Sequence, residues 1–336
     1  MKVMKYKDGL WPNTFMLAWV LVTYIVGIGF CLAPEWLLNL CGVILLAHSM
    51  ILAAYLIHEC AHNTIFASSK MNMRLAEALN WITGAIYSPF EAIRYKHMRH
   101  HVDRADVVTY EYRAWLKAAP ASTLKWLGRA EALGIPALEV GMRFLALVIP
   151  FVDPMFEERR VRVVVVLVLR VVFFVSLTFI SPIFLMFYLF AYLISLQVLR
   201  FMDAYQHTYP LREDLYDASI PNGPAPGLDR EFEERNTFSN PISERWSLLN
   251  LLVLNFGFHN AHHRRPSQPW HRLPAQHREL YSESNDQVLM PRETRSSFVR
   301  YRRDRILNED LPDIGVKRGS AKDFIGVDGV SFLIPF

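Results

Sequence analysis

The chain has 336 residues, of which 52% are hydrophobic and 13% aromatic, with only 15 glycines and a mean hydropathy of +0.15. This composition is more apolar than that of ordinary soluble domains and favours a membrane protein. A net charge of +4 without any block of like charge argues against nucleic-acid binding, and three cysteines without a CxxC spacing argue against a disulfide scaffold or a cysteine-ligated metal.

Two apolar runs near the N-terminus predict a transmembrane hairpin. Residues 14–33 are uncharged and long enough to cross a bilayer, and residues 37–57 form a second such run after a short turn. Lys2, Lys5 and Lys7 precede the first run, as they would in a signal peptide. We interpret the run as a retained span, because it is longer than a signal-peptide core and no convincing small-residue cleavage site follows it.

A third apolar block predicts a second hairpin. Ser181 and Pro182 interrupt it near its middle, so we expect two spans, at about residues 161–181 and 183–202. Arg170 lies inside the first of these, where a charge costs roughly 2.5 to 3.5 kcal/mol on insertion scales. Its side chain is expected to snorkel to the interface, with a lipid or substrate head group as the alternative partner.

The remaining segments are more polar. Residues 58–160 and 203–280 carry apolar residues at helical spacing interrupted by charges, which predicts a helical cap outside the membrane. Residues 246–258 are apolar but too few to span, and we expect them to lie along the interface. The sequence thus predicts an all-α integral membrane protein, with a domain over residues 1–280 and a polar tail over 281–336.

The distribution of basic residues predicts the topology. The two short turns within the hairpins carry no lysine or arginine, whereas the termini and long segments carry many. The positive-inside rule therefore places both termini and the cap in the cytoplasm. The basic residues near the predicted spans and in the cap include Lys2, Lys5, Lys7, Lys70, Arg74, Arg94, Lys96 and Arg99.

Nine of the twelve histidines form four groups, all expected on the cytoplasmic side. On a helix, HxxxH puts two imidazoles on one face and HxxHH puts three there. The groups are HECAH with His58 and His62, HMRHH with His97, His100 and His101, the lone His207, and HNAHH with His259, His262 and His263. We interpret the other three, His48, His271 and His277, as structural.

Nine imidazoles are too many for one zinc ion, which takes three or four ligands, but they suit two metals. Imidazole binds zinc, copper, iron and nickel, so ligand type alone does not fix the metal. HECAH alone also matches the zinc-peptidase pattern, with Glu59 as general base. That alternative needs a further acidic ligand, and no Asp or Glu lies in the last two predicted spans before Asp203. A metal transporter or sensor would instead carry ligands within the spans.

The sequence resembles the membrane fatty-acid desaturase and hydroxylase superfamily. The resemblance rests on the order of the three boxes, the lone histidine after the last span, and the stretch PSQPWHRLP at 266–274. The resemblance extends from about residue 14 to about residue 280. It implies four spans and a cytosolic site with two iron ions, which activates dioxygen. The implied metal ligands are His58, His62, His97, His100, His101, His207, His259, His262 and His263, with no catalytic residue beyond them.

Some positions depart from the family or extend its ligand set. The first box has three residues between its histidines, whereas members that act on acyl-CoA often have four. Asp203 stands four positions before the lone histidine, where some members have an asparagine, and it is a candidate extra ligand or orienting residue. Asn255 is a weaker candidate of the same kind. Glu59 and Asp106 are candidates for holding a ligating imidazole through its free N–H group.

The resemblance implies a dioxygen-dependent fatty acyl desaturase, with a hydroxylase or an oxidative decarboxylase that releases a terminal alkene as same-site alternatives. Fatty acyl substrate and membrane lipid are the expected partners. The chain lacks CxxC pairs and a His-Pro-Gly-Gly stretch of the cytochrome b5 type. Electrons are therefore expected from a separate ferredoxin, rubredoxin or cytochrome-type donor with its reductase. The basic cytosolic face is a plausible dock for an acidic carrier.

Overall fold

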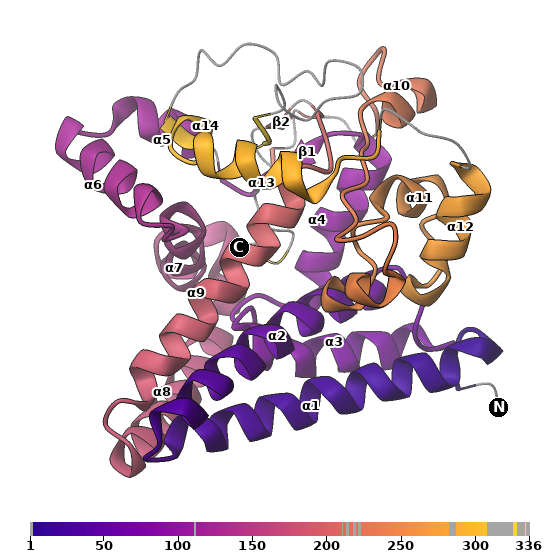
Figure 1. Ribbon diagram of the computed structural model, residues 1–336. Coiled ribbons are helices and arrows are strands. Elements are labelled where there is room, and N and C mark those ends of the chain that lie inside the picture. Colours follow the sequence, from indigo (N-terminus) through magenta and orange to yellow (C-terminus); the bar gives the residue numbers. More distant parts are fainter. Residues whose placement is uncertain are drawn as a thin grey trace. The chain divides into compact units, whose positions relative to one another are not determined.

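The fold was obtained as a computed structural model (Figure 1). It describes residues 3–110, 112–209, 211–212, 215–217, 220, 223–281, 287–307, 325–327 and 333. This part of the chain is mostly helical. Its one sheet is a parallel pair of two-residue strands, β1 (Asp106–Val107) and β2 (Leu211–Arg212). The predicted all-α class is therefore confirmed.

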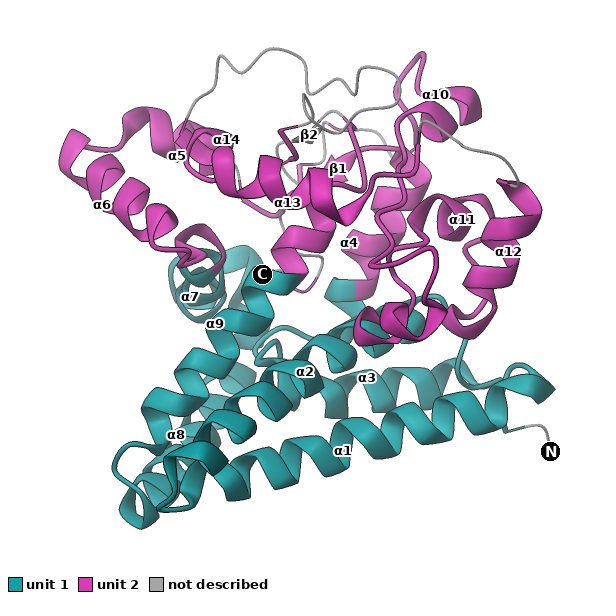
Figure 2. Ribbon diagram, viewed as in Figure 1, with its two compact units in different colours: residues 1–93, 140–198, 336 teal, residues 94–139, 199–335 magenta. Residues whose placement is uncertain are grey.

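The chain forms two compact units (Figure 2), which we describe separately. Unit 1 comprises residues 1–93 and 140–198, and unit 2 comprises residues 94–139 and 199–335. Helices α4, α7 and α9 run from one unit into the other. The helices are α1 (Leu10–Leu32), α2 (Trp36–Ala61), α3 (Ser69–Thr83), α4 (Phe90–Asp103), α5 (Tyr112–Ala118), α6 (Ala121–Ala132), α7 (Ala137–Val152), α8 (Arg160–Ile180), α9 (Phe184–Asp203), α10 (Arg230–Arg235), α11 (His259–Arg264), α12 (Leu273–Leu280), α13 (Pro291–Arg300) and α14 (Asp304–Leu307).

Within the described residues, four helical segments are long and apolar enough to cross a membrane: Lys7–Leu32, Trp36–Ala61, Pro154–Ile180 and Phe184–Asp203. Each corresponds to one predicted span, so the prediction of four spans is confirmed. Helices α6 and α7 pass the same test only when taken together as a bent pair, which would make a fifth.

Helices α1 and α2 form the first hairpin because small residues let their backbones approach closely (Figure 1). A Cβ added to Gly42 would lie 2.8 Å from the carbonyl oxygen of Gly27. At the turn, the Asn39 side chain donates hydrogen bonds of 2.9 Å to the carbonyls of Phe30 and Ala33. The Phe30 carbonyl also accepts a hydrogen bond of 3.2 Å from the Ala33 N–H group, which caps α1. Asn39 thus adds side-chain donors to carbonyls at the end of α1.

Helix α8 differs from α2 in its surroundings. Most of α2 is buried, whereas α8 exposes nearly all of its apolar side chains. So large an apolar surface is unfavourable in water and fits contact with lipid. Arg170 has a partner that the sequence did not indicate. Its guanidinium donates a hydrogen bond of 3.1 Å to the carbonyl of Trp81, near the end of α3. Helix carbonyl ends carry partial negative charge, so this contact stabilises the half-buried cation.

The short apolar run of residues 246–258 folds mainly as a 3-10 helix, η3 (Ser247–Val253). Asn250 is buried and anchors it to the backbone of Ser243. Several apolar side chains instead remain exposed: Trp246, Leu248, Leu249 and Leu252. The segment is absent from the helices that could span, as expected, and its place along the membrane interface stays a prediction.

The described part of the predicted polar tail contributes to the core of unit 2. Leu289 and Phe298 of this segment are buried with Ala204, Tyr205 and Phe238. The Phe298 ring also packs edge-on against Phe201, with 5.1 Å between ring centroids. Residues 282–286, 308–324, 328–332 and 334–336 of the predicted tail lie outside the described residues.

Candidate metal centre

Helix α4 carries the second histidine box in unit 2. Near its end, Arg99 forms an ion pair with Asp103, whose other carboxylate oxygen accepts a hydrogen bond of 2.7 Å from the Gly223 N–H group. His97 and His101 are four residues apart and therefore lie on one stripe of the helix. His100 is rotated by about 100° from His101, because each helical residue turns the chain by that angle.

The third box lies on α11, a short helix held by its surroundings. Leu254 and Asn255 adopt the left-handed conformation, with φ of 50° and 59°, and turn the chain between η3 and α11. Gly257 follows where the backbone passes Asn240, and an added Cβ there would lie 2.8 Å from the Asn240 carbonyl oxygen. The Gln276 side chain donates to the carbonyl of Ala261 at 2.6 Å. These contacts fix the rotation of α11 within unit 2.

His207 follows the end of α9 and is held by a short antiparallel pairing opposite Thr237. The Thr208 N–H group donates to the carbonyl of Asn236 at 3.0 Å, and the Phe238 N–H group donates to that of Gln206 at 2.8 Å. The His207 imidazole is therefore positioned by backbone contacts on both sides.

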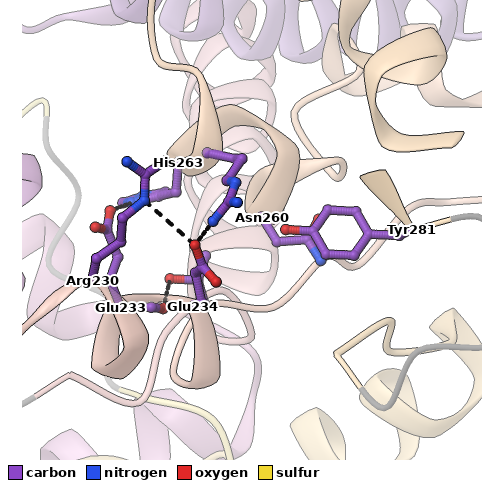
Figure 3. A pocket seen from close by; sticks show the side chains of 8 residues that line it. Arg230, Glu233, Glu234, Asn260, His263 and Tyr281 are labelled. Atoms are coloured by element: carbon purple, nitrogen blue, oxygen red, sulfur yellow. Dashed lines mark hydrogen bonds and ion pairs between the residues drawn. The ribbon is translucent and has the colours of Figure 1, made fainter. Parts of the chain in front are cut away.

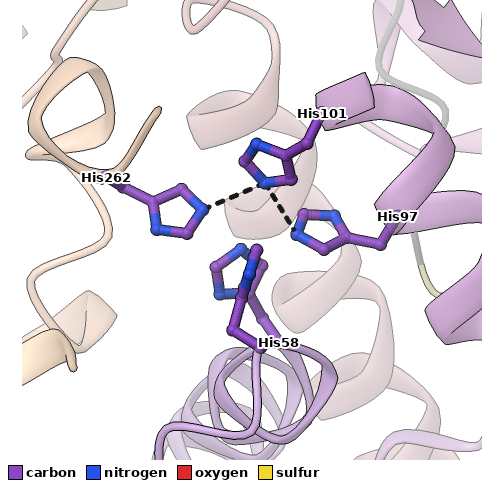
Figure 4. A group of neighbouring side chains, drawn as sticks. His58, His97, His101 and His262 are labelled. Atoms are coloured by element: carbon purple, nitrogen blue, oxygen red, sulfur yellow. Dashed lines mark hydrogen bonds between the residues drawn. The ribbon is translucent and has the colours of Figure 1, made fainter. Parts of the chain in front are cut away.

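The seven histidines of unit 2 form two groups. Group A comprises His97, His101 and His262, and group B comprises His100, His207, His259 and His263; within each group the donor nitrogens lie within 4.8 Å of one another. In group A (Figure 4), Nε2 of His101 lies 3.1 Å from Nε2 of His97 and 3.2 Å from Nε2 of His262. In group B, Nε2 of His207 lies 3.0 Å from Nε2 of His100 and 2.7 Å from Nε2 of His259.

The two HxxHH boxes divide their histidines in a reciprocal way. The second box gives its i, i+4 pair, His97 and His101, to group A and the remaining His100 to group B. The third box gives its i, i+4 pair, His259 and His263, to group B and the remaining His262 to group A. Each helix thus contributes to both groups.

The chemistry of group B fits a bound cation. Its Nε2 atoms approach one another to hydrogen-bond distance, but a neutral imidazole carries only one N–H group to share among them. Nε2 of His263 is buried and has no hydrogen-bond partner in the described part of the chain. Burial lowers the pKa of His100 to about 4 and lowers the pKa values of His207 and His263 well below the ordinary value. His100, His207 and His263 therefore favour the neutral form at pH 7, which is the form that binds metals.

The outward nitrogens of two group B rings face acceptors. Nδ1 of His100 lies 2.9 Å from the carbonyl oxygen of Ala105 and 3.6 Å from the carboxylate of Asp106. The Ala105 carbonyl is therefore nearer to His100 than Asp106, the partner that the sequence predicted. Nδ1 of His263 lies 3.1 Å from Oε1 of Glu233. Sequence reasoning missed Glu233, because a glutamate 30 positions before the histidine, in the charged stretch REFEER, gives no local signal.

Unit 1 contains the first box, which forms the last turn of α2. The ring centroids of His58 and His62 lie 4.8 Å apart, so both imidazoles share one side of the helix end, as predicted. The buried Glu59 carboxylate lies 3.7 Å from Nδ1 of His58, and it accepts a hydrogen bond from the Thr64 hydroxyl. Glu59 thus lies beside an imidazole, and its orienting role stays a prediction.

Asp203 and Asn255 belong to neither group among the described residues. Asp203 ends α9 and lies near the buried Lys96. Burial lowers the pKa of Lys96 to about 7, although the charges of Asp106 and Asp203 favour its protonated form. Asn255 donates a hydrogen bond of 3.2 Å to the Trp270 carbonyl, which ties the third box to the stretch at 266–274. Their proposed roles at the metals stay predictions.

The comparisons with known proteins give one match. The fatty acid desaturase family model matches residues 34–294, which is more than half of the chain and includes all nine predicted ligands. A search of the curated proteins and a search of the solved structures found no match. The family and the four apolar helices together indicate a multi-pass membrane oxidoreductase. The chain belongs to the fatty acid desaturase family.

Proposed function

We propose that this protein is a di-iron, dioxygen-dependent fatty acyl desaturase that introduces a double bond into an acyl chain at the membrane. The observation that carries the proposal is the pair of histidine groups within unit 2. The groups adjoin, since the ring centroids of His101 in group A and His263 in group B lie 4.3 Å apart. Two adjoining sets of imidazoles suit two metal ions that act together.

In this proposal His58 and His62 complete group A, so that five imidazoles hold one iron and four hold the other. The support is the sequence: the positive-inside rule puts the end of α2 on the same membrane face as the other boxes. A zinc peptidase built on HECAH would leave the seven histidines of unit 2 without a role. The active site and both termini are cytoplasmic in this proposal.

The bound irons would supply an oxidant, made from dioxygen, for an unactivated C–H bond. The chain's own residues hold the metals, favour the neutral form of His100, His207 and His263 by burial, and exclude water. Five of the seven imidazoles in unit 2 are buried, and His100 and His101 are partly buried. Glu59 is a candidate for orienting His58, and Asp106 supports His100, whose nearer acceptor is the Ala105 carbonyl. Asp203 and Asn255 are further candidates for contacts at the metals.

The overall reaction consumes dioxygen, two electrons and two protons. It converts a saturated acyl segment to one with a double bond and releases two water molecules. Hydroxylation or oxidative decarboxylation of a free fatty acid to a terminal alkene would use the same histidines. We favour desaturation because it is the commonest outcome in the family that the chain resembles.

The two electrons come from a separate ferredoxin, rubredoxin or cytochrome-type donor with its reductase. The support is a basic surface on α13, where Arg292, Arg295 and Arg300 are exposed and line one shallow hollow. In the described part of the chain none of the three forms an ion pair with a carboxylate. The buried side of α13 packs Phe298 against Tyr205, two residues before His207. An acidic carrier on this surface would therefore lie over a segment that leads to group B.

Product analysis tests the reaction. The purified protein in detergent, with a reducing system and a fatty acid or its thioester, would be incubated in air, and the products identified by mass spectrometry. A product lighter by two hydrogens supports the proposal. An added oxygen atom would identify a hydroxylase, and a terminal alkene with loss of carbon dioxide would identify a decarboxylase. Peptide cleavage without acyl oxidation would contradict all three.

A further inference from the structure

Glu233 on α10 lies between the third histidine box and the end of α4. Its Oε1 atom is 3.1 Å from Nδ1 of His263, and its Oε2 atom accepts a hydrogen bond from Nε of Arg104, also at 3.1 Å. The carboxylate is mostly buried, with 14% of its side chain exposed. Other glutamates of α10 have different partners: Glu231 is exposed and pairs with Arg235 of the same helix.

We infer that Glu233 is a positioning residue that fixes the tautomer and orientation of His263, an inference that rests on the proposed metal-binding function. A carboxylate accepts a hydrogen and cannot donate one when ionised, so Nδ1 of His263 must carry the N–H group. The lone pair then lies on Nε2, which is buried among the other donors of group B. Carboxylates that hold imidazoles in this way raise the affinity of the site for its metal.

Arg104 holds the carboxylate in place. It follows α4 in the left-handed conformation, with φ of 53°, and its N–H group donates to the carbonyl of His100. Its guanidinium also donates to the carbonyl of Leu228 at 2.7 Å. Arg104 thus connects the end of the second box to Glu233, and through it to His263 of the third box.

Glu233 could instead be a metal ligand, because its carboxylate together with His101 and His263 forms a third set of close donors. A metal in that set would take Nδ1 of His263 and leave its buried Nε2 unsatisfied. The orienting arrangement satisfies both nitrogens, since Nδ1 donates to Glu233 and Nε2 faces group B. Leaving a buried polar atom unpaired is costly, so the orienting arrangement is favoured.

The pair borders a small hollow lined by polar side chains (Figure 3). Glu233 and His263 line it with Arg230, Asn260 and Tyr281. A change from carboxylate to amide at this place keeps the volume of the side chain and leaves a polar environment around it. We therefore expect the Glu233→Gln variant to fold.

The test is a titration of metal-depleted full-length protein in detergent with Co²⁺, followed by its visible absorption, together with the iron content after purification. In Glu233→Gln the amide N–H group can donate to Nδ1, which favours the tautomer whose Nε2 carries hydrogen. We expect metal affinity at one of the two sites to fall roughly 10- to 100-fold. Glu233→Asp, which retains the carboxylate, should recover part of this loss. Glu231→Gln is the matched control on the same helix and should bind like the wild type.

Unchanged cobalt binding in Glu233→Gln, with normal binding by the wild type, would overturn the inference and leave the proposed function intact. An equal loss in Glu231→Gln would also overturn it, because the effect would then belong to α10 as a whole. A wild type that binds neither cobalt nor iron would overturn the proposed function and this inference together. If Glu233→Gln fails to fold, as judged by thermal unfolding, Glu233→Asp and Arg104→Gln decide: intermediate losses support the inference, and wild-type binding in both overturns it.

Discussion

The Nε2 atoms of His207 and His259 lie 2.7 Å apart, although 52 positions separate the two residues in the sequence. His207 is held by the backbone pairing after α9, and His259 begins α11. Their approach therefore depends on two independently positioned segments. It places both residues in group B and separates them from His262, which is only three positions beyond His259 but belongs to group A.

This division predicts that histidine substitutions fall into two classes. His97→Ala and His262→Ala should each remove the same metal, and His207→Ala and His259→Ala should remove the other, because the metal follows the group and not the box. Mössbauer spectroscopy of the iron-loaded variants would show which of two signals is lost, and each variant should lose activity by about 100-fold or more.

One of the three histidines interpreted as structural provides the control: His271→Ala should keep both signals. Double variants sharpen the test. A pair from one group should cost little more than either change alone, whereas a pair from different groups should lose both signals. Loss of the same signal by His259→Ala and His262→Ala would contradict the division.

Gly257 predicts a structural effect on the third box. In Gly257→Ala, the new Cβ would lie 2.8 Å from both the Asn240 carbonyl oxygen and Cα of Pro241, so the backbone must move. We expect a loss of roughly 1 to 3 kcal/mol in the free energy of unfolding and weaker metal binding by α11. Thermal unfolding in detergent measures the first effect. Gly141→Ala in α7, where an added Cβ meets no atom within 4 Å, should be neutral or stabilising. Equal behaviour of the two variants would argue against the close approach.

The lowered pKa values predict how the metal-free protein responds to acid. Burial lowers the pKa of His100 to about 4 and that of His263 well below the ordinary value of about 6.5. Between these values the unfolded chain binds protons that the folded chain does not. Stability should therefore fall as the pH is lowered through 6.5 towards 4, by up to about 1.4 kcal/mol per pH unit for each such histidine. Thermal unfolding from about pH 7 to about pH 5 checks the sign, and a midpoint that rises on acidification would contradict it.

The basic surface of α13 predicts how electrons arrive. Arg292→Glu combined with Arg295→Glu should lower kcat/KM for an acidic ferredoxin by about 10-fold or more at low salt, since electrostatic steering mainly changes the association rate. Added salt should lower the wild-type rate and reduce the difference between wild type and variant.

Activity with a small chemical reductant provides the control, because it needs no docking surface and should be unchanged in the variant. A wild-type rate with ferredoxin that is insensitive to salt would contradict electrostatic docking. If binding of the variant to anionic vesicles fell while its rate with ferredoxin stayed normal, the surface would serve the membrane and not the donor.

Much of this protein follows from its sequence, because two signals are strong and local. Long apolar runs predicted the four spanning helices, and histidine spacing predicted which imidazoles share a helix face. The division of each box between two groups was not predictable, since it depends on the rotation of α4 and α11. That rotation is set by contacts from distant parts of the chain, such as the approach of Gly257 to Asn240.

Two further partners also lacked a local signal. Arg170 finds the carbonyl of Trp81 89 positions away, and Glu233 reaches His263 across 30 positions. The segment after residue 280 was expected to be a polar tail, yet Phe298 lies in the core of unit 2. A single aromatic side chain within a polar helix does not reveal in advance which surface it covers.

The metal content of the purified full-length protein tests the central claim most directly. Elemental analysis should find about two irons per chain, and His207→Ala should reduce this to about one, because it disrupts group B and leaves group A intact. One zinc per chain with negligible iron, or iron content unaffected by His207→Ala, would contradict the account.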